Sequence, residues 1–165
     1  KYSLSDGWGV YGLGVFEDAN DFRYLYLLSN DRANNKVISS KYNQRVSSSG
    51  VMKKETVPLI RLGEMYYIRA EYYNSKEDDT NAKNELAILR SAYNCPPDKL
   101  TGDFVDELIN EVHREYLGEG QLFFYYKRNA LQHIPDGGTV NSIKNISLDS
   151  YVFPLPDSET SQRAE

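Results

Sequence analysis

The chain contains little cysteine and histidine, and each shortage excludes a kind of site. One cysteine, Cys95, among 165 residues cannot close an intrachain disulfide, so the fold does not rest on a disulfide framework. The two histidines, His113 and His133, belong to no Cys-His cluster or zinc-protease motif. We therefore expect no metal site and no cofactor, and we expect both histidines to be exposed or satisfied by hydrogen bonds.

Basic charge and long apolar runs are also scarce. The 19 Lys and Arg residues against 24 Asp and Glu residues give a net charge of −5, whereas sequence-independent binding to nucleic acid needs a basic face. We therefore expect no nucleic-acid partner. No run approaches the roughly eighteen apolar residues of a membrane-spanning helix, and residues 1–6 lack the basic-then-apolar pattern of a signal peptide. We expect a soluble chain, or the soluble segment of a longer protein.

Tyrosine, by contrast, is abundant. Fourteen Tyr and six Phe residues account for most of the 13% aromatic content. Tyrosine combines a flat apolar ring with a polar hydroxyl, so such a chain can build a core and also leave amphipathic surfaces. Surfaces that bind sugars and surfaces that bind proteins both use this property, and composition does not distinguish them.

Residues 1–50 are predicted to form a loop-rich aromatic segment. Four glycines at every second or third position surround Trp8 and Tyr11, and this spacing would be costly inside a helix or strand. The rings of Trp8 and Tyr11 could present flat faces to a ligand, or they could pack onto the rest of the protein, as large aromatic residues usually do. Residues 22–28 are aromatic and apolar, and they fit either a short strand or one turn of helix.

Residues 57–130 are predicted to form the helical core. Pro58 suits the first turn of a helix, and apolar residues then recur at the three- and four-residue spacing of a helix face. Four such segments are indicated: Leu59–Tyr73, Ala82–Tyr93, Val105–Tyr116 and Leu122–Arg128. The expected N-caps of the second and third helices are Asp78, Asp79 or Thr80 and Thr101 or Asp103. Helices joined by short turns pack as antiparallel neighbours, so we expect two helix hairpins in a tetratricopeptide-like layout. No sequence repeat at the roughly 34-residue period of that class is present.

Residues 131–165 are predicted to form a loop and a closing strap. Residues 139–149 are polar and irregular, whereas residues 151–156 hold two prolines that restrain the backbone to extended geometry. We expect a single domain over residues 1–165. Its expected fold is mainly α, with tetratricopeptide-like helix hairpins, long Gly/Pro-rich loops and an extended C-terminal strap.

Three carboxylates are candidates for acid–base chemistry. Glu111, Glu115 and Glu119 recur every four residues, so they share one helix face and could shift one another's pKa. The alternative is a solvated acidic stripe, or ion pairs with nearby basic residues: Arg114, Lys127 and Arg128. A glycosidase needs two carboxylates that converge across a sugar, and one helix face does not provide that geometry. The sequence also lacks a nucleophile elbow, so no motif in it favours nucleophilic catalysis.

Consecutive segments resemble a known family. Residues 58–71 read Pro-Leu-Ile-Arg-Leu-Gly-Glu-Met-Tyr-Tyr-Ile-Arg-Ala-Glu, which resembles the RagB/SusD helix Arg-Leu-x-Glu-Met-Tyr-Leu-Ile-x-Ala-Glu. Further segments resemble family elements in the family's order: Ala82–Arg90, Ile109–Gln121, Phe123–Arg128 and Tyr151–Glu159, with Asp21–Arg23 and Lys41–Tyr42 upstream. The chain departs from the pattern at residues 91–94 and at His113, which stands where the family has an arginine. The resemblance covers roughly residues 21–160.

This resemblance implies a lipid-anchored protein at the cell surface, on the outer membrane of Gram-negative bacteria, with the anchor outside this chain. Members of the RagB/SusD family capture glycans, or sometimes peptides, for a SusC-like TonB-dependent outer-membrane transporter. They are binding proteins and not enzymes, so the resemblance implies that this protein is not an enzyme. The chain would then be the C-terminal part of a longer protein. The resemblance also implies framework roles in helix packing for five charged residues: Glu64, Glu71, Arg114, Glu115 and Glu119.

Three functional hypotheses result. The one we favour is non-catalytic capture of an oligosaccharide for a SusC-like transporter, with Trp8 and Tyr11 stacking on sugar rings. The second is an interaction module that docks a peptide or a transporter and binds no sugar. The third is a glycoside-processing enzyme that uses the acidic stripe.

Overall fold

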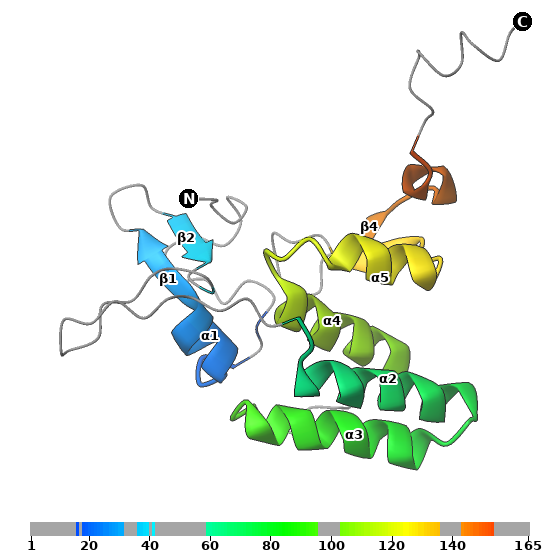
Figure 1. Cartoon of the computed structure of the whole chain (residues 1–165), viewed down its shortest axis with the longest axis horizontal. Helices are drawn as coiled ribbons and strands as arrows, with labels where there is room; N and C mark the ends of the chain where they lie inside the picture. Colours follow the sequence, from blue (N-terminus) through cyan, green and yellow to red (C-terminus); the bar gives the residue numbers. More distant parts are fainter. Residues whose placement is uncertain are drawn as a thin grey trace, which may run out of the picture.

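The part of the chain that the computed structural model describes is mainly helical, as the sequence predicts (Figure 1). The described residues are 16, 18–31, 36–39, 41, 59–95, 103–135 and 143–153. The α-helices are α1 (Phe22–Leu27), α2 (Leu62–Ser75), α3 (Asp79–Ala92), α4 (Phe104–Tyr116) and α5 (Leu122–Arg128). The strands form two antiparallel pairs, β1 (Leu28–Asp31) with β2 (Lys36–Ser39) and β3 (His133–Pro135) with β4 (Ile143–Asn145). Within these ranges, no helix has both the length and the apolar character needed to cross a membrane.

Helix α2 begins at Leu62, so the prediction that Leu59 and Ile60 are already helical is wrong, and Pro58 lies outside the described residues. The backbone of Arg61 is extended, with φ −119° and ψ 144°. Leu59 and Ile60 before it are 95% and 76% exposed. A further helical turn over these residues would bury little apolar surface in this chain, and a helix gains most of its stability from such burial.

Aspartates begin the next two long helices, as predicted. The carboxylate of Asp78 caps α3 by accepting a hydrogen bond from the backbone N–H of Asn81 at 3.2 Å. Asp103 caps α4 in the same way, with its carboxylate 2.9 Å from the backbone nitrogen of Val105. Each cap satisfies a backbone donor that the first helical turn leaves without an intrahelical partner.

The predicted break after the third long helix is also confirmed. Helix α4 ends at Tyr116, and Gly118 and Gly120 both have φ of 75°. This left-handed backbone costs glycine little because it has no Cβ atom. The chain thereby turns into α5, which spans the predicted residues 122–128.

The main core lies between α2, α3 and α4. Ala70 and Ala82 are fully buried, and their small side chains let α2 and α3 approach closely as the neighbouring antiparallel pair in Figure 1. The buried members of this core are Tyr67, Ala70, Ala82, Leu86, Leu89, Phe104, Leu108 and Val112. Partly buried tyrosines surround them: Tyr66, Tyr73, Tyr93, Tyr116 and Tyr125. Tyrosine therefore supplies much of the core, while the wider tetratricopeptide-like arrangement remains a prediction.

A second, smaller cluster joins α5 to the end of the described chain. Ile109, Tyr126 and Tyr151 are its buried members. The hydroxyl of Tyr151 donates a hydrogen bond to the carbonyl oxygen of Leu131 at 2.6 Å. Of the consecutive aromatic residues 123–126, Tyr126 is buried in this cluster, whereas Phe124 is 64% exposed.

The C-terminal strap, predicted over residues 151–156, is helical at Tyr151 and has the expected extended backbone at Val152, while residues 154–156 lie outside the described residues. Leu148–Tyr151 forms a short 3₁₀ helix, so the prediction of extended backbone at Tyr151 is wrong. The side chain of Ser147 accepts a hydrogen bond from the backbone N–H of Asp149, which favours this local turn over a strand. Phe153 still packs toward the helices, with its ring centre 5.3 Å from that of Phe123.

Near the N-terminal side of the described chain, residues 22–27 form a helical turn and the strand begins at Leu28. Asp21 caps this turn, since its carboxylate accepts a hydrogen bond from the backbone N–H of Arg23. The backbone N–H of Phe22 donates to the carbonyl oxygen of Tyr93 at 2.9 Å. This bond ties α1 to the end of α3.

Candidate functional site

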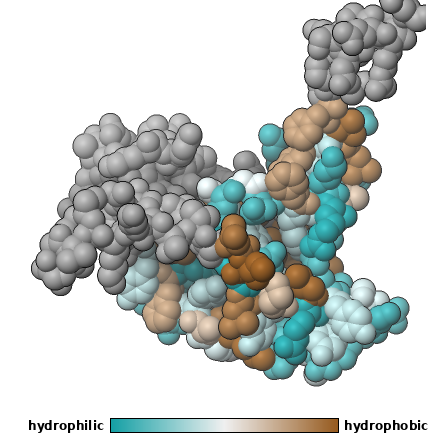
Figure 2. Space-filling model, viewed as in Figure 1, coloured by the Kyte–Doolittle hydropathy of each residue, from teal (hydrophilic) through white to brown (hydrophobic). Residues whose placement is uncertain are grey.

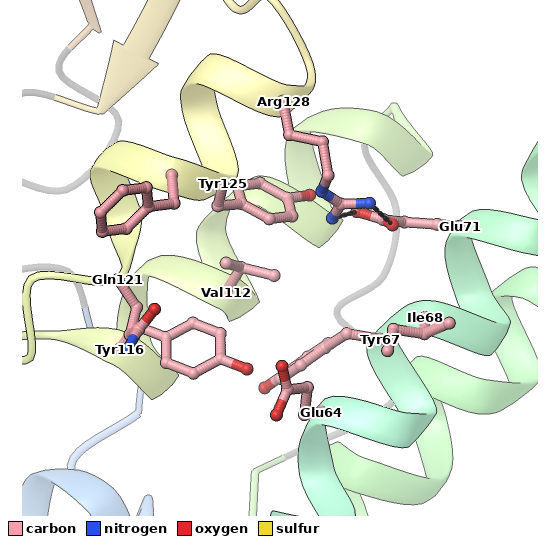
Figure 3. Close-up of a pocket in the computed structure, with 10 residues that line it drawn as sticks. Glu64, Tyr67, Ile68, Glu71, Val112, Tyr116, Gln121, Tyr125 and Arg128 are labelled. Atoms are coloured by element: carbon pink, nitrogen blue, oxygen red, sulfur yellow. Dashed lines mark hydrogen bonds and ion pairs between the residues drawn. The ribbon is translucent and has the colours of Figure 1, made fainter. Parts of the chain in front are cut away.

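A groove between α2, α4 and α5 is the candidate binding site (Figure 3). We call it the α2–α5 groove. Its first hollow has a volume of about 330 Å³ and is lined by Glu64, Tyr67, Ile68, Glu71, Val112, Tyr116, Gln121, Phe124, Tyr125 and Arg128. A second hollow of about 540 Å³ shares Ile68, Glu71 and Tyr125 with the first. Both volumes lie in the range typical of sites for small ligands.

Helical spacing brings the lining residues together. On α2, Glu64, Ile68 and Glu71 are separated by four and then three residues, so their side chains share one face. On α5 and the residue before it, the same spacing brings four side chains to the groove: Gln121, Phe124, Tyr125 and Arg128. The site therefore combines aromatic rings with polar groups along two helices.

An ion pair closes one side of the groove. The terminal nitrogens Nη1 and Nη2 of Arg128 donate to Oε2 and Oε1 of Glu71, each at 2.9 Å. The hydrogen bonding to Glu71 raises the pKa of Arg128 despite some loss of hydration. The guanidinium carbon of Arg128 also lies 5.5 Å from the ring centre of Tyr125. The pair links α5 to α2, in agreement with the framework role expected for Glu71.

Glu64 and Tyr116 form the polar end of the same hollow. Figure 3 shows the Glu64 carboxylate pointing toward the hydroxyl group of Tyr116. Burial and then the negative charge of Glu64 raise the pKa of Tyr116 to about 12, so its phenol stays protonated at neutral pH. Among the ion pairs within the described ranges, none involves Glu64.

Tyr67 connects the groove to the buried interior. Its side chain lines the first hollow and is 3% exposed. The hydroxyl of Tyr67 donates to the backbone carbonyl of Glu111 at 3.4 Å and accepts a hydrogen bond from Nη1 of Arg23 at 3.5 Å. Burial, reinforced by the charge of Glu111, raises the pKa of Tyr67 well above its usual value. Tyr67 therefore lines the groove and also contacts the buried network of charged residues next to it.

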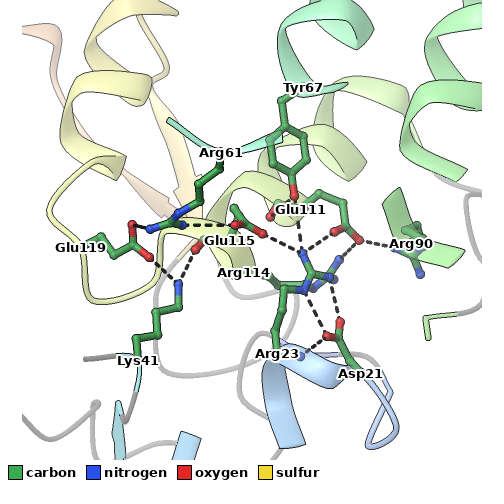
Figure 4. A network of polar contacts seen from close by, with 10 residues as sticks. All are labelled: Asp21, Arg23, Lys41, Arg61, Tyr67, Arg90, Glu111, Arg114, Glu115 and Glu119. Carbon is green, nitrogen blue, oxygen red and sulfur yellow. Dashed lines mark hydrogen bonds and ion pairs between the residues drawn. The ribbon is translucent and has the colours of Figure 1, made fainter. Parts of the chain in front are cut away.

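The buried network centres on Glu111, which has no exposed surface (Figure 4). Nη1 of Arg90 and Nη1 of Arg114 both donate to its Oε1 at 2.7 Å. Nη1 of Arg23 lies 2.9 Å from Oε2, and Asp21 holds the other side of that guanidinium with contacts of 3.1 and 2.7 Å. Burial alone would raise the pKa of Glu111, but the three guanidinium groups outweigh it and lower this pKa.

A second set of charges continues the network toward Lys41. Nη1 of Arg61 donates to Oε1 of Glu115 at 3.2 Å, and its Nη2 contacts Glu119. Nζ of Lys41 donates to Oε1 of Glu119 at 2.7 Å and also contacts the backbone carbonyl of Glu115. Burial lowers the pKa of Lys41. Burial alone would raise the pKa of Glu119, but the hydrogen bonds that Glu119 accepts from Arg61 and Lys41 outweigh the effect of burial, so the pKa of Glu119 is lowered.

The three carboxylates spaced every four residues are thus structural groups. The expectation of a solvated acidic stripe is wrong, because Glu111, Glu115 and Glu119 have side chains that are at most 8% exposed. The alternative prediction, that these carboxylates form ion pairs with nearby basic residues, is confirmed for Arg114, which pairs with Glu111. Within the described chain, no ion pair joins the stripe to Lys127 or Arg128. Its other partners come from distant segments that the sequence did not single out as partners: Arg23, Lys41, Arg61 and Arg90.

The remaining predicted residues are Trp8, Tyr11 and the two histidines. Trp8 and Tyr11 lie outside the described residues. His133 is exposed, and its Nδ1 lies 2.6 Å from Oδ1 of Asn145. His113 is buried, and its Nδ1 has no hydrogen-bond partner within the described ranges, so the expectation of a satisfied or exposed His113 is wrong. Burial and then the charge of Arg114 lower its pKa to about 4.

The described part of the chain contains neither a candidate metal site nor a reactive thiol. No group of three or more His, Cys, Asp or Glu side chains there could hold a metal ion. Cys95 is buried, and burial raises the pKa of its thiol to about 11. A thiol with such a pKa is almost entirely protonated at neutral pH and is a poor nucleophile.

Comparison with known proteins supplies the family. No curated protein and no solved structure matches the chain. The model of the SusD family matches residues 26–164. This range includes α2, α3, α4 and α5 and the carboxylates at the centre of the buried network. Because the match covers most of the chain and agrees with the resemblance of its motifs, the protein belongs to the SusD family.

Proposed function

We propose that this protein binds an oligosaccharide at the bacterial cell surface, leaves it chemically unchanged, and passes it to a TonB-dependent outer-membrane transporter. The observation that carries the proposal is the composition of the α2–α5 groove. A sugar presents an apolar C–H face and an edge of hydroxyl groups. Tyr116, Phe124 and Tyr125 offer rings to such a face, while Glu64 and Gln121 offer hydrogen-bonding groups to the hydroxyls.

The family provides the setting for this proposal. The SusD family consists of non-catalytic binding proteins for nutrients or glycans, which are generally lipoproteins located at the cell surface. The oligosaccharide, the SusC-like transporter and the lipid anchor of this particular protein are the finer parts of the proposal. They rest on the resemblance of its motifs to the RagB/SusD pattern.

Trp8 and Tyr11 are proposed as additional stacking residues. Their glycine-rich surroundings in the sequence suit a loop that presents aromatic faces to a ligand. They provide a comparison with the groove, because the two sets of aromatic residues can be changed independently.

A calorimetric titration with a panel of oligosaccharides tests the proposal. We expect saturable binding of at least one oligosaccharide, which chromatography recovers intact after incubation. Binding should weaken when an aromatic ring that stacks on the sugar is removed, by Phe124→Ala in the groove or by Trp8→Ala. Absence of binding across the panel, or release of shorter sugars by the protein, would contradict capture without chemistry.

An exposed apolar stripe on α2 favours a second candidate, a module that docks another protein. Its members are Leu59 and Ile60 just before the helix, and Leu62, Met65, Ile68 and Tyr72 within it, and each is at least 40% exposed. Figure 2 shows hydrophobic residues gathered near the start of α2. Exposed apolar patches of this kind mark surfaces that contact other proteins. Capture of the transporter by the protein, weakened by Met65→Asp and insensitive to added oligosaccharide, would support this candidate.

A further inference from the structure

We propose that the α2–α5 groove selects oligosaccharides that are neutral or carry amino groups and rejects those that carry carboxylates. This inference rests on the proposed function, and it assigns the class of sugar from the charges that line the groove. It concerns three charged side chains among the lining residues: Glu64, Glu71 and Arg128.

Two of these charges cancel. Both terminal nitrogens of Arg128 donate to the two carboxylate oxygens of Glu71 in a bidentate pair. Such a pair satisfies the geometry of both groups at once. The carboxylate of an acidic sugar would have to displace Glu71 before it could take over these hydrogen bonds. Arg128 is therefore a poor anchor for an anionic ligand.

Among the charged side chains that line the groove, Glu64 is the one whose charge no other lining residue balances. None of the ion pairs within the described chain involves it, and in Figure 3 its carboxylate points toward the hydroxyl of Tyr116 at the polar end of the hollow. A sugar hydroxyl or ammonium group can donate a hydrogen bond to this carboxylate. A sugar carboxylate at the same end would be repelled by it.

The other polar lining groups are neutral. Gln121 can donate and accept hydrogen bonds, and Tyr116 keeps its phenolic proton because burial and Glu64 raise its pKa to about 12. These groups suit the hydroxyl and amide substituents of neutral sugars. Among the lining residues, no positive charge is left to pair with the carboxylate of an acidic sugar.

A glycan array with matched charge classes tests the inference. It would carry neutral, amino-bearing and carboxylate-bearing oligosaccharides on common backbones, such as β-1,4-linked tetramers of glucose, glucosamine and glucuronic acid. At low salt, we expect acidic members to bind about tenfold or more weakly than their neutral counterparts, as expected for one partly screened repulsive charge. Glu64→Gln should narrow this gap severalfold, whereas Glu77→Gln, which removes an exposed charge outside the groove, should leave it unchanged.

The outcomes separate this inference from the proposed function. Stronger binding of acidic sugars, or a preference that Glu64→Gln leaves intact, would overturn the inference while capture of oligosaccharides stands. The inference would also be overturned, and capture of oligosaccharides would stand, if Trp8→Ala abolished binding while Phe124→Ala, at an exposed position in the groove, had no effect. If no member of any charge class binds, both the inference and the proposed function fail.

Discussion

The guanidinium of Arg23 lies 2.9 Å from the carboxylate of Glu111, and both side chains are almost completely buried. This contact joins the first turn of α1 to the middle of α4. Two further arginines, Arg90 and Arg114, share the same carboxylate. A buried carboxylate among several guanidinium groups is stable only when all partners are in place, because an unpaired buried charge is very costly.

Replacing the central carboxylate should therefore destabilise the protein strongly. We expect Glu111→Gln to lower the free energy of unfolding by about 3–5 kcal/mol, since it leaves three arginines without their shared partner. Urea denaturation followed by circular dichroism measures this loss. The control is Glu71→Gln, which breaks a bidentate pair whose arginine is 58% exposed and should cost about 1 kcal/mol or less. Equal losses in the two variants would contradict the central role of Glu111.

Acid should unfold the protein through the same carboxylates. The pKa values of Glu111 and Glu119 are lowered in the folded protein, so the folded state binds these protons less readily than the unfolded state. The stabilisation they provide is present above the unfolded pKa of about 4.3 and is lost as the pH falls through the lower folded values. Stability measured between pH 5 and pH 2 should fall, and this fall should become shallower in Glu119→Gln. A slope identical to that of the wild type would refute the assignment.

His113 should produce a separate pH dependence at higher pH. Its folded pKa of about 4 lies below the unfolded value of about 6.5, so protonation favours unfolding. Stability should decline as the pH falls from about 6.5 toward 4, by on the order of 3 kcal/mol over the whole window. His113→Gln should flatten this part of the curve, whatever its effect on overall stability. His133→Gln, at an exposed position, should retain the decline, and an unchanged curve in His113→Gln would count against the account.

Local patterns predicted the helices better than they predicted the charges. The apolar spacing and the capping aspartates Asp78 and Asp103 located the beginnings of α3 and α4, because both signals act within a few residues. The predicted start of α2 is wrong because Pro58 and Leu59 fit a helical pattern locally, whereas Leu59 is exposed in the folded chain. Periodicity shows that a face is apolar, and tertiary contacts decide whether it is buried.

The site itself could be predicted only in part. Glu111 and Arg114 are close in sequence, so their ion pair was among the expected alternatives, whereas Arg23 and Arg90 reach Glu111 only through the tertiary fold. The α2–α5 groove was not predicted. Its lining comes from three helices, and no single stretch of sequence marks the position of Glu64 opposite Tyr116.

We propose that this member of the SusD family binds an oligosaccharide and leaves it intact. Isothermal titration calorimetry with the panel of oligosaccharides, followed by chromatography of each ligand after incubation, tests this proposal directly. We expect saturable binding of a neutral or amino-bearing oligosaccharide, weakened by Phe124→Ala or Trp8→Ala, with the ligand recovered at its original length. Absence of saturable binding across the panel, or recovery of shortened sugars, would contradict it.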